Sequence, residues 1–391
     1  MRNRTAICFL LSGLLVASAQ SVATASATPT GNSRIFWALQ KSPNPSGNGA
    51  LNGVECTGAK DCITVGSYYN HSIKAQLPLA ASWNGKLWKL QPTPAPARTS
   101  YSQLDGVSCA KRTFCSAVGS DVLTSKRAIT LAEVWRGKRW EITRTPPLKS
   151  LLYNSLQAIS CASATDCMAV GSAGQKVLIE HWQGARWTIQ RAPRPADSKY
   201  SMLYGVSCVT RKWCMAAGYY APPSGGTFAF TEIWEGKRWS VRPAKQIQGS
   251  ASQLLGISCT SRVSCTAAGT YGDLASLNYP LAEHWNGKAW SIQSVPHPKG
   301  QADSSLTAVA CVRRHACTAV GVYFTKTGPI YAFAESWNGK AWVLQSTVNP
   351  SKTNNSLVGV ACTRARTCTA VGGYAGRESV ARSLVERSPA D

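Results

Sequence analysis

The sequence has few of the residues with which enzymes usually perform catalysis or hold metal ions. It contains 5 histidines in 391 residues, and they do not have the spacing of metal ligands. Acids are also scarce, with 18 aspartates and glutamates against 42 lysines and arginines. It has no phosphate-cradling glycine loop, nucleophile elbow or zinc-protease helix. The composition therefore predicts no metal and no cofactor, and it offers no catalytic motif.

Long apolar runs are also missing beyond the N-terminus, where none approaches the roughly 20 residues of a membrane span. Residues Met1–Ala27 carry Arg2 and Arg4, then the apolar segment Ala6–Ala17, and end in the small residues Ala25–Ala27. This order is typical of a secretory signal peptide. We therefore predict a signal peptide over residues 1–27, no transmembrane anchor, and a secreted, extracellular chain.

Cysteine is the residue that organises the chain. Of its 15 cysteines, 14 form seven pairs of the pattern C-x5-C, and the first cysteines of successive pairs are 47 to 53 residues apart. In an exported protein this pattern favours seven disulfides. Zinc is the competing interpretation, but no histidine recurs beside the pairs. The predicted disulfides are Cys56–Cys62, Cys109–Cys115, Cys161–Cys167, Cys208–Cys214, Cys259–Cys265, Cys311–Cys317 and Cys362–Cys368.

Each repeat contains four short apolar segments, which we expect to be β-strands. In the fifth repeat they are 255–259, 265–271, 280–285 and 288–295. Asn286-Gly287 between the last two is a strong signal for a two-residue hairpin turn. Such a turn would place the two tryptophans of each W-x4-W motif diagonally on one face of the hairpin. Four strands in about 51 residues are typical of a β-propeller blade.

The two ends of the chain complete one another. Residues 36–45 match 87–96, the fourth strand of the first repeat, yet no other strand precedes them. Residues 382–388 resemble a third strand with no fourth strand after it. The sequence therefore predicts an all-β fold: one seven-bladed propeller domain over residues 28–391, with four antiparallel strands and one disulfide per blade. The N-terminal strand would be the outer strand of the last blade and close the ring.

Charge gives the main functional indication. The formal net charge is +24, or +22 without Arg2 and Arg4. Cations gather between the paired cysteines and in the W-x4-W turns, and in an up-and-down blade both connections lie on one rim, which would carry about +16 of this charge. The candidate residues for binding a polyanion on that rim are Lys111, Arg112, Lys138, Arg139, Arg211, Lys212, Arg262, Arg313, Arg314, Arg364 and Arg366. A basic rim that only keeps the protein soluble is the alternative. Nucleic acid is the less favoured polyanion, because no nucleic-acid-binding motif accompanies the charge.

Tyrosines recur six residues after the second cysteine, where the second strand would reach the opposite rim. Tyrosine can stack on a sugar ring or a peptide. The competing interpretation is that these side chains fill the gap between neighbouring blades. The candidate ligand-binding residues are Tyr68, Tyr220, Tyr271, Tyr323 and Tyr374, together with Asp121, which occupies this position in the second repeat.

A glutamate recurs on the third strand of six repeats, as in Glu283 and Glu335. The predicted turn would place these two diagonally to Lys288 and Lys340, which favours a surface ion pair. The remaining acids are scattered singly through the loops. A glycosidase needs two carboxyl groups at one point, so carbohydrate hydrolysis or lysis by loop carboxylates at the propeller mouth is the second functional hypothesis.

With these motifs in view, the chain resembles a group of secreted bacterial β-propeller repeat proteins that have G-V-x-C-x5-C-x-A-V-G and W-x-G-x-x-W in each blade. The resemblance covers residues 36–388. It implies the propeller architecture and carries no catalytic residue. The chain is more loosely similar to sialidase-type propellers, but their aspartate-box pattern S-x-D-x-G-x-x-W is missing.

The leading hypothesis from the sequence is a non-enzymatic, monomeric binding or scaffold propeller that binds an extracellular carbohydrate or an anionic polymer of the cell envelope. A structural envelope protein whose repeats pack in an oligomer is a third possibility.

Overall fold

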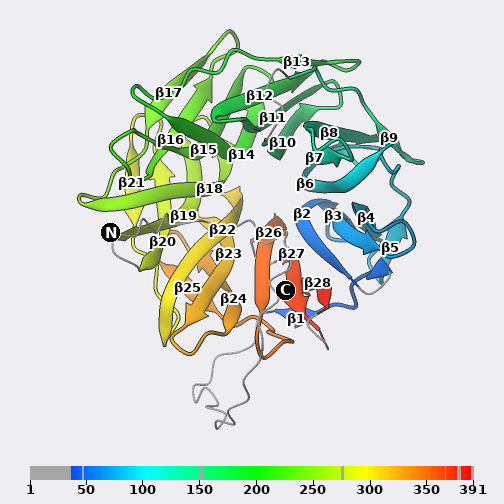
Figure 1. Ribbon diagram of the computed structural model, residues 1–391. Coiled ribbons are helices and arrows are strands. Elements are labelled where there is room, and N and C mark those ends of the chain that lie inside the picture. Colours follow the sequence, from blue (N-terminus) through cyan, green and yellow to red (C-terminus); the bar gives the residue numbers. More distant parts are fainter. Residues whose placement is uncertain are drawn as a thin grey trace. The chain divides into compact units, whose positions relative to one another are not determined.

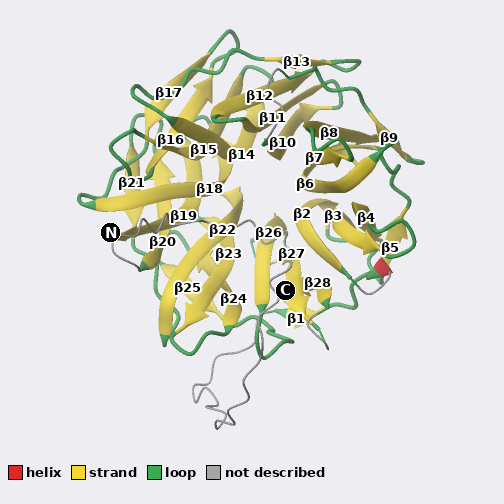
Figure 2. Cartoon of the chain, in the orientation of Figure 1, coloured by secondary structure: helices red, strands yellow, loops and turns green. Residues whose placement is uncertain are grey.

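The structure is a computed structural model that describes residues 37–45, 48–148, 153–273, 277–365, 367–376 and 380–388. These residues form an all-β chain of antiparallel sheets arranged as a β-propeller (Figures 1 and 2). The predicted signal peptide and Arg366 lie outside the described residues. In the described part of the chain, no helix is long and apolar enough to cross a membrane.

Four sheets contain four strands each, which follow one another in the chain from the inner to the outer strand. The first consists of β10 (Asn154–Ser163), β11 (Asp166–Ala173), β12 (Lys176–Trp182) and β13 (Trp187–Ile189). The second consists of β14 (Tyr200–Thr210), β15 (Trp213–Ala221), β16 (Phe228–Trp234) and β17 (Trp239–Pro243). The third consists of β18 (Ser250–Ser261), β19 (Ser264–Asp273), β20 (Asn278–Trp285) and β21 (Trp290–Gln293). The fourth consists of β22 (Gln301–Arg313), β23 (Ala316–Thr325), β24 (Ile330–Trp337) and β25 (Trp342–Gln345).

The fifth four-stranded sheet joins the two ends of the chain. Its inner strands are β26 (Asn355–Arg364), β27 (Thr367–Ala375) and β28 (Ala381–Arg387), and β1 (Ala38–Leu39) pairs antiparallel with β28. The Ser383 hydroxyl also donates to the Pro43 carbonyl at 2.7 Å. Arg387 lies over the Trp83 ring of the first repeat, 4.6 Å from its centroid. The predicted closure by the N-terminal strand is confirmed.

The expectation of seven separate blades is wrong, because only five four-stranded sheets are present among the described residues. The first two repeats share one eight-stranded sheet. It consists of β2 (Gly49–Gly58), β3 (Asp61–Asn70), β4 (Ala75–Trp83), β5 (Trp88–Gln91), β6 (Thr99–Lys111), β7 (Phe114–Leu123), β8 (Ala128–Trp135) and β9 (Trp140–Ile142).

A parallel bridge between Gln76 in β4 and Tyr101 in β6 joins these two repeats. The first residues of β6 reach β4 here, although β22, which has the same 13 residues, does not join the sheet before it. A similar approach occurs between Ile330 and Asn354, but Asn354 precedes β26 and the bridge stays isolated. The merged sheet therefore results from a tertiary contact that the repeat pattern does not contain.

The inner strands of the repeats contact one another in sequence around a central axis. β2 contacts β6, β6 contacts β10, and the series continues through β14, β18, β22 and β26, which contacts β2 (Figure 1). The core lies between neighbouring sheets. One buried cluster, for example, joins Val118 and Val134 of the second repeat to Leu156 and Trp182 of the third. Such shared cores explain why no repeat would bury its apolar face alone.

The glycine of the A-V-G motif lies on the second strand of each repeat, where two backbones approach closely. A Cβ atom added at Gly119 would be 2.0 Å from the carbonyl oxygen of Gln103 on the inner strand. The inner strand has a register shift at this level, between Leu104 and Gly106. Glycine is required here because any side chain would collide with the bulged backbone.

All seven predicted disulfides are present, with Cα–Cα distances of 3.9 to 4.0 Å. Each joins directly opposed residues of the first two strands, such as Cys259 and Cys265. The register continues across the sheet, where Cys265 faces Trp285 and Trp285 faces Trp290. The tryptophans are therefore directly opposed. The two-residue turn had predicted a diagonal placement, which is wrong. The loop has four residues, closed by a bond from the Asn286 N–H to the Ala289 carbonyl at 3.3 Å.

Candidate functional site

The turns between the first two and the last two strands of each repeat lie at the same end of the sheets, and we call this end the disulfide rim. Its described lysines and arginines are all exposed. Between the cysteines they are Lys60, Lys111, Arg112, Arg211, Lys212, Arg262, Arg313, Arg314 and Arg364. In the W-x4-W turns they are Lys86, Arg136, Lys138, Arg139, Arg186, Lys237, Arg238, Lys288 and Lys340. The structure thus places every described candidate for polyanion binding on one rim.

Few of these cations are neutralised by carboxylates. Arg139 lies 2.6 Å from the Glu141 carboxylate, Arg136 lies 3.8 Å from it, and Arg112 lies 3.7 Å from Asp61. Within the described ranges, no other lysine or arginine of the disulfide rim has an ion pair. The remaining charges are therefore free to meet an external anion.

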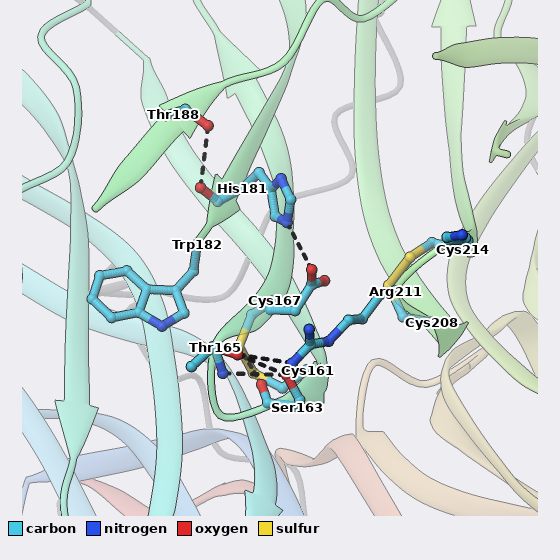
Figure 3. A network of polar contacts seen from close by, with 12 residues as sticks. Cys161, Ser163, Thr165, Cys167, His181, Trp182, Thr188, Cys208, Arg211 and Cys214 are labelled. Carbon is cyan, nitrogen blue, oxygen red and sulfur yellow. Dashed lines mark hydrogen bonds and ion pairs between the residues drawn. A yellow bond between two sulfur atoms is a disulfide. The ribbon is translucent and has the colours of Figure 1, made fainter. Parts of the chain in front are cut away.

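Arg211 is held in place by the neighbouring repeat (Figure 3). Its Nη2 donates to the Ser163 and Thr165 hydroxyls, both at 2.9 Å. In the same region His181 Nε2 lies 3.3 Å from the Asp166 carboxylate. The Arg211 bonds link the turns of two repeats, whereas the His181–Asp166 contact lies within the third repeat. This part of the rim is therefore ordered by side chains as well as by disulfides.

The opposite rim is also basic, which corrects the expectation of one charged face. Its exposed cations are Lys41, Lys74, Arg98, Lys126, Arg127, Arg144, Lys176, Arg191, Arg194, Lys199, Lys245, Lys299, Lys326 and Lys352. The sequence analysis had expected the strand glutamates at the surface, in ion pairs with turn lysines such as Lys288 and Lys340. Those glutamates are buried and neutralise nothing at the surface.

The six strand glutamates are fully buried between neighbouring repeats. Glu133, Glu180, Glu232, Glu283, Glu335 and Glu386 each have 0% exposure. The expected surface ion pairs are therefore absent among these residues. In the observed register Glu283 faces Ile292, not Lys288, and Ile292 covers it on the outer strand. Burial raises the pKa of Glu133, Glu232, Glu335 and Glu386 to about 8, and that of Glu180 and Glu283 to about 7.

For five of the six buried glutamates, the partner depends on one residue of the preceding repeat, six positions after its outer-strand tryptophan. The exception is Glu180, where this residue is Pro146 and the Thr130 hydroxyl donates to the carboxylate at 3.1 Å. Where this residue is Lys245 or Val348, its N–H donates to the carboxylate of Glu283 or Glu386 at 2.9 and 3.0 Å. Where it is Pro94, Pro193 or Pro296, there is no N–H to donate. Both carboxyl oxygens of the facing Glu133, Glu232 and Glu335 have no partner among the described residues.

The candidate tyrosines do not gather at one site. Tyr68, Tyr220, Tyr271, Tyr323 and Tyr374 are each half-buried and pack against five different apolar clusters. The rings of Tyr220, Tyr271 and Tyr323 contact aromatic side chains of the same sheet, as in Tyr271 with Tyr279 at 5.6 Å between centroids. A role in ligand binding remains a prediction that these contacts leave untested.

Asp121 is 1% exposed and accepts a hydrogen bond from the Thr99 hydroxyl at 2.6 Å. Burial raises its pKa. The sequence had singled out Asp121 and had placed Asp105 among the scattered loop acids. Asp105 instead lies half-buried on the inner strand β6, and a second half-buried acid, Glu55 on β2, was missed. Burial raises the pKa of both Glu55 and Asp105 to about 7. Asp105 accepts bonds from the amide groups of Gln103 and Asn52 at 2.8 and 3.2 Å. Glu55 and Asp105 could have been singled out from the sequence, because the other repeats have no acid at these positions of the first strand.

An open groove of about 450 Å³ lies where the fifth repeat meets the sixth. It is lined by Ile292, Gln293, Ser294 and Pro296 of one repeat and by Trp337, Lys340, Ala341 and Trp342 of the next. We call it the Trp337 groove. Sequence reasoning missed it, because Trp337 has the same motif position as the buried tryptophans of other repeats. No group of three or more side chains suited to a metal ion occurs in the described part of the chain.

Comparisons with known proteins support the fold alone. No protein-family model matches the chain, and no curated protein matches it significantly. It is similar to the solved structure of YCF48 bound to D1 peptide, with 12% identity, a TM-score of 0.53, and coverage of 91% of this chain and 97% of the other.

It is also similar to an ulvan lyase bound to -[GlcA(1-4)Rha3S]-, with 11% identity, a TM-score of 0.54, and coverage of 86% and 93%. A GH74 xyloglucanase from Xanthomonas campestris has 13% identity and a TM-score of 0.53, with coverage of 90% of this chain and 55% of that one. These β-propellers differ widely in what they bind, so the shared fold does not select a ligand.

Proposed function

We propose that the protein is a secreted, non-enzymatic binding propeller that holds an anionic polymer of the extracellular space or the cell envelope. The observation that supports it is the large number of exposed lysines and arginines on both rims, of which few have a carboxylate partner. A surface with this much unbalanced charge attracts polyanions over a distance of about 8–10 Å at ordinary salt concentrations.

Secretion agrees with the seven disulfides, because such bonds persist mainly in oxidising compartments. A polymer is favoured over a small anion because the cations are spread along the rims and do not converge on one point. Many weak contacts along a chain then add up to a useful affinity.

The test measures binding of the chain to polygalacturonate and to polyphosphate at two salt concentrations. We expect binding at low salt that falls steeply as salt rises, because each neutralised charge releases a counterion. Retention that does not depend on salt, or no retention at low salt, contradicts the proposal. Shortening of the polymer during incubation would instead support the hydrolase or lyase hypothesis.

Charge reversal then decides which rim is used. The triple variant Arg262→Glu, Arg313→Glu, Arg314→Glu changes the disulfide rim, and Arg191→Glu, Arg194→Glu, Lys199→Glu changes the opposite rim by the same net charge. All six side chains are exposed, so both variants should fold. We expect the disulfide-rim variant to lose more affinity, since that rim has the denser set of cations. Equal losses would show that only net charge matters.

A further inference from the structure

The tryptophan that lines the Trp337 groove is partly accessible, as Trp135 is in the second repeat, whereas the other tryptophans at this position are buried. At the equivalent position of the preceding repeat, Trp285 is 6% exposed and its indole N–H donates to the Arg262 carbonyl at 3.2 Å. Trp182 and Trp234 make the same bond with the turns of their own repeats. Trp337 is half-buried and has no such bond in the described part of the chain. It therefore offers the groove both an apolar ring and an unused donor.

A cation, Lys340, lines the same groove and stands in a turn of fixed shape. Lys340 is exposed and has no ion pair among the described residues. The Asn338 side-chain oxygen accepts the backbone N–H groups of Lys340 and Ala341, each at 2.9 Å. This bonding orders the turn before any ligand arrives, which reduces the entropy lost on binding.

The other wall of the groove is apolar with one amide. Ile292 is 42% exposed, and Pro296 lies beside it in the lining. Gln293 accepts the Trp342 indole N–H through its side-chain oxygen at 3.0 Å, which fixes the amide across the two repeats. An accessible ring, apolar side chains and a neighbouring cation are suited to a ligand that has both a C–H face and a negative charge.

We propose that the Trp337 groove binds one carboxylated sugar ring, and therefore that the anionic polymer is an acidic polysaccharide. The sugar's apolar face would lie against Trp337 and Ile292, and its carboxylate would meet Lys340. This inference rests on the proposed function and adds the chemical class of the polymer. A polyphosphate chain has no ring to occupy the groove and would contact only the rim cations.

The first test compares Ile292→Glu with Ile189→Glu. Both isoleucines occupy the same position of an outer strand, opposite a buried glutamate, and they are 42% and 47% exposed. Only Ile292 lines the groove. We expect Ile292→Glu to weaken binding of polygalacturonate about tenfold and Ile189→Glu by less than about threefold, because only the first places a like charge beside the bound carboxylate. Equal losses would overturn the groove as a site.

The second test compares Lys340→Ala with Lys288→Ala. The two lysines stand in turns of the same sequence, Asn-Gly-Lys-Ala, and both are exposed. We expect Lys340→Ala to lower the affinity for polygalacturonate about 3- to 10-fold more than Lys288→Ala, and the two to affect polyphosphate equally. Dextran, which is uncharged, should not bind measurably.

The outcomes separate the two proposals. If the unmodified chain binds neither polymer at low salt, the proposed function fails. If it binds polyphosphate as tightly as polygalacturonate and the matched variants behave alike, the proposed function stands and the groove proposal is overturned.

Discussion

Two neighbouring surfaces between repeats each bury a strand glutamate, and they differ in whether a backbone amide bonds to its carboxyl group. Where the fourth repeat meets the fifth, the Lys245 N–H donates to the Glu283 carboxylate at 2.9 Å. Where the fifth meets the sixth, Pro296 occupies the equivalent position and both oxygens of Glu335 have no partner among the described residues. The turns beyond both surfaces have the same sequence, Asn-Gly-Lys-Ala.

The comparison shows how a hydrogen bond modifies the effect of burial. Both carboxyl groups are fully buried, and burial raises the pKa of Glu335 to about 8. Burial also raises the pKa of Glu283, but the Lys245 amide opposes it and the value is about 7. The amide is one of several contributions, because the charge of Lys245 also lowers the pKa of Glu283, whereas Glu386 bonds to the Val348 amide and its pKa is still about 8.

The largest expected effect is a loss of stability as the pH rises. The buried glutamates have pKa values of about 7 to 8 in the folded chain, against an ordinary value of 4.5. Between these values the folded chain holds protons that the unfolded chain has released, so the free energy of unfolding falls with rising pH. We expect on the order of 1 kcal/mol per pH unit for each titrating carboxyl.

Thermal unfolding between pH 6.5 and 8.5 measures this loss. The range avoids most of the opposing contribution of His284, whose pKa is lowered from 6.5, mainly by burial. A Tm that is constant or rises over this range would contradict the prediction.

Lys245→Pro should make the surface between the fourth and fifth repeats resemble that between the fifth and sixth, where Pro296 stands. It removes the amide that bonds Glu283, and we expect a cost of about 1–3 kcal/mol, because a buried acceptor loses its partner. Lys245→Ala keeps the N–H and is the matched control, which should cost little. Denaturant unfolding at pH 7 compares the two variants, and equal losses would show that the amide is not responsible.

Glu335→Gln tests the surface on which the buried carboxyl group has no amide partner among the described residues. Glutamine has nearly the same shape and does not ionise, so the variant should be similar to the parent at pH 5 and more stable at pH 8.5, by about 3 kcal/mol at the loss per pH unit given above. Glu283→Gln should gain less at pH 8.5, because the Lys245 amide already stabilises the ionised carboxylate. A gain of the same size in both variants would mean that the hydrogen bond has no influence.

Pro296→Ala should have the smallest effect. It restores an N–H opposite Glu335 and is expected to lower the pKa of that carboxyl towards that of Glu283. A gain in stability at pH 8.5 of less than about 1 kcal/mol is expected, since proline also restricts the unfolded chain and its loss is unfavourable. A gain at pH 5 as large as that at pH 8.5 would indicate a packing effect instead.

The sequence alone predicted the features that depend on local spacing. Cys259 and Cys265 are close enough in the chain for a hairpin to oppose them, and the matching segments at the two ends predicted that β1 would pair with β28. The turn was misjudged because Asn286-Gly287 fits a two-residue loop, whereas the paired tryptophans Trp285 and Trp290 fix a four-residue loop. Packing of two large rings outweighed the local preference of the turn.

The functional surface was less predictable. The positions of Arg262 and Lys340 on one rim followed from the strand order. The exposure of Trp337 and the burial of Glu335 did not, because both depend on which side chain of the neighbouring sheet lies opposite.

The sequence thus determined a β-propeller whose hairpins are linked by disulfides. Repeat length, cysteine spacing and the split last repeat were sufficient, since these constraints act within one repeat or between the chain's ends. Tertiary structure decided that the first two repeats share a sheet, that the strand glutamates are buried, and that both rims are basic. Each of these depends on contacts between repeats, such as the Gln76–Tyr101 bridge, which the motif within one repeat does not specify.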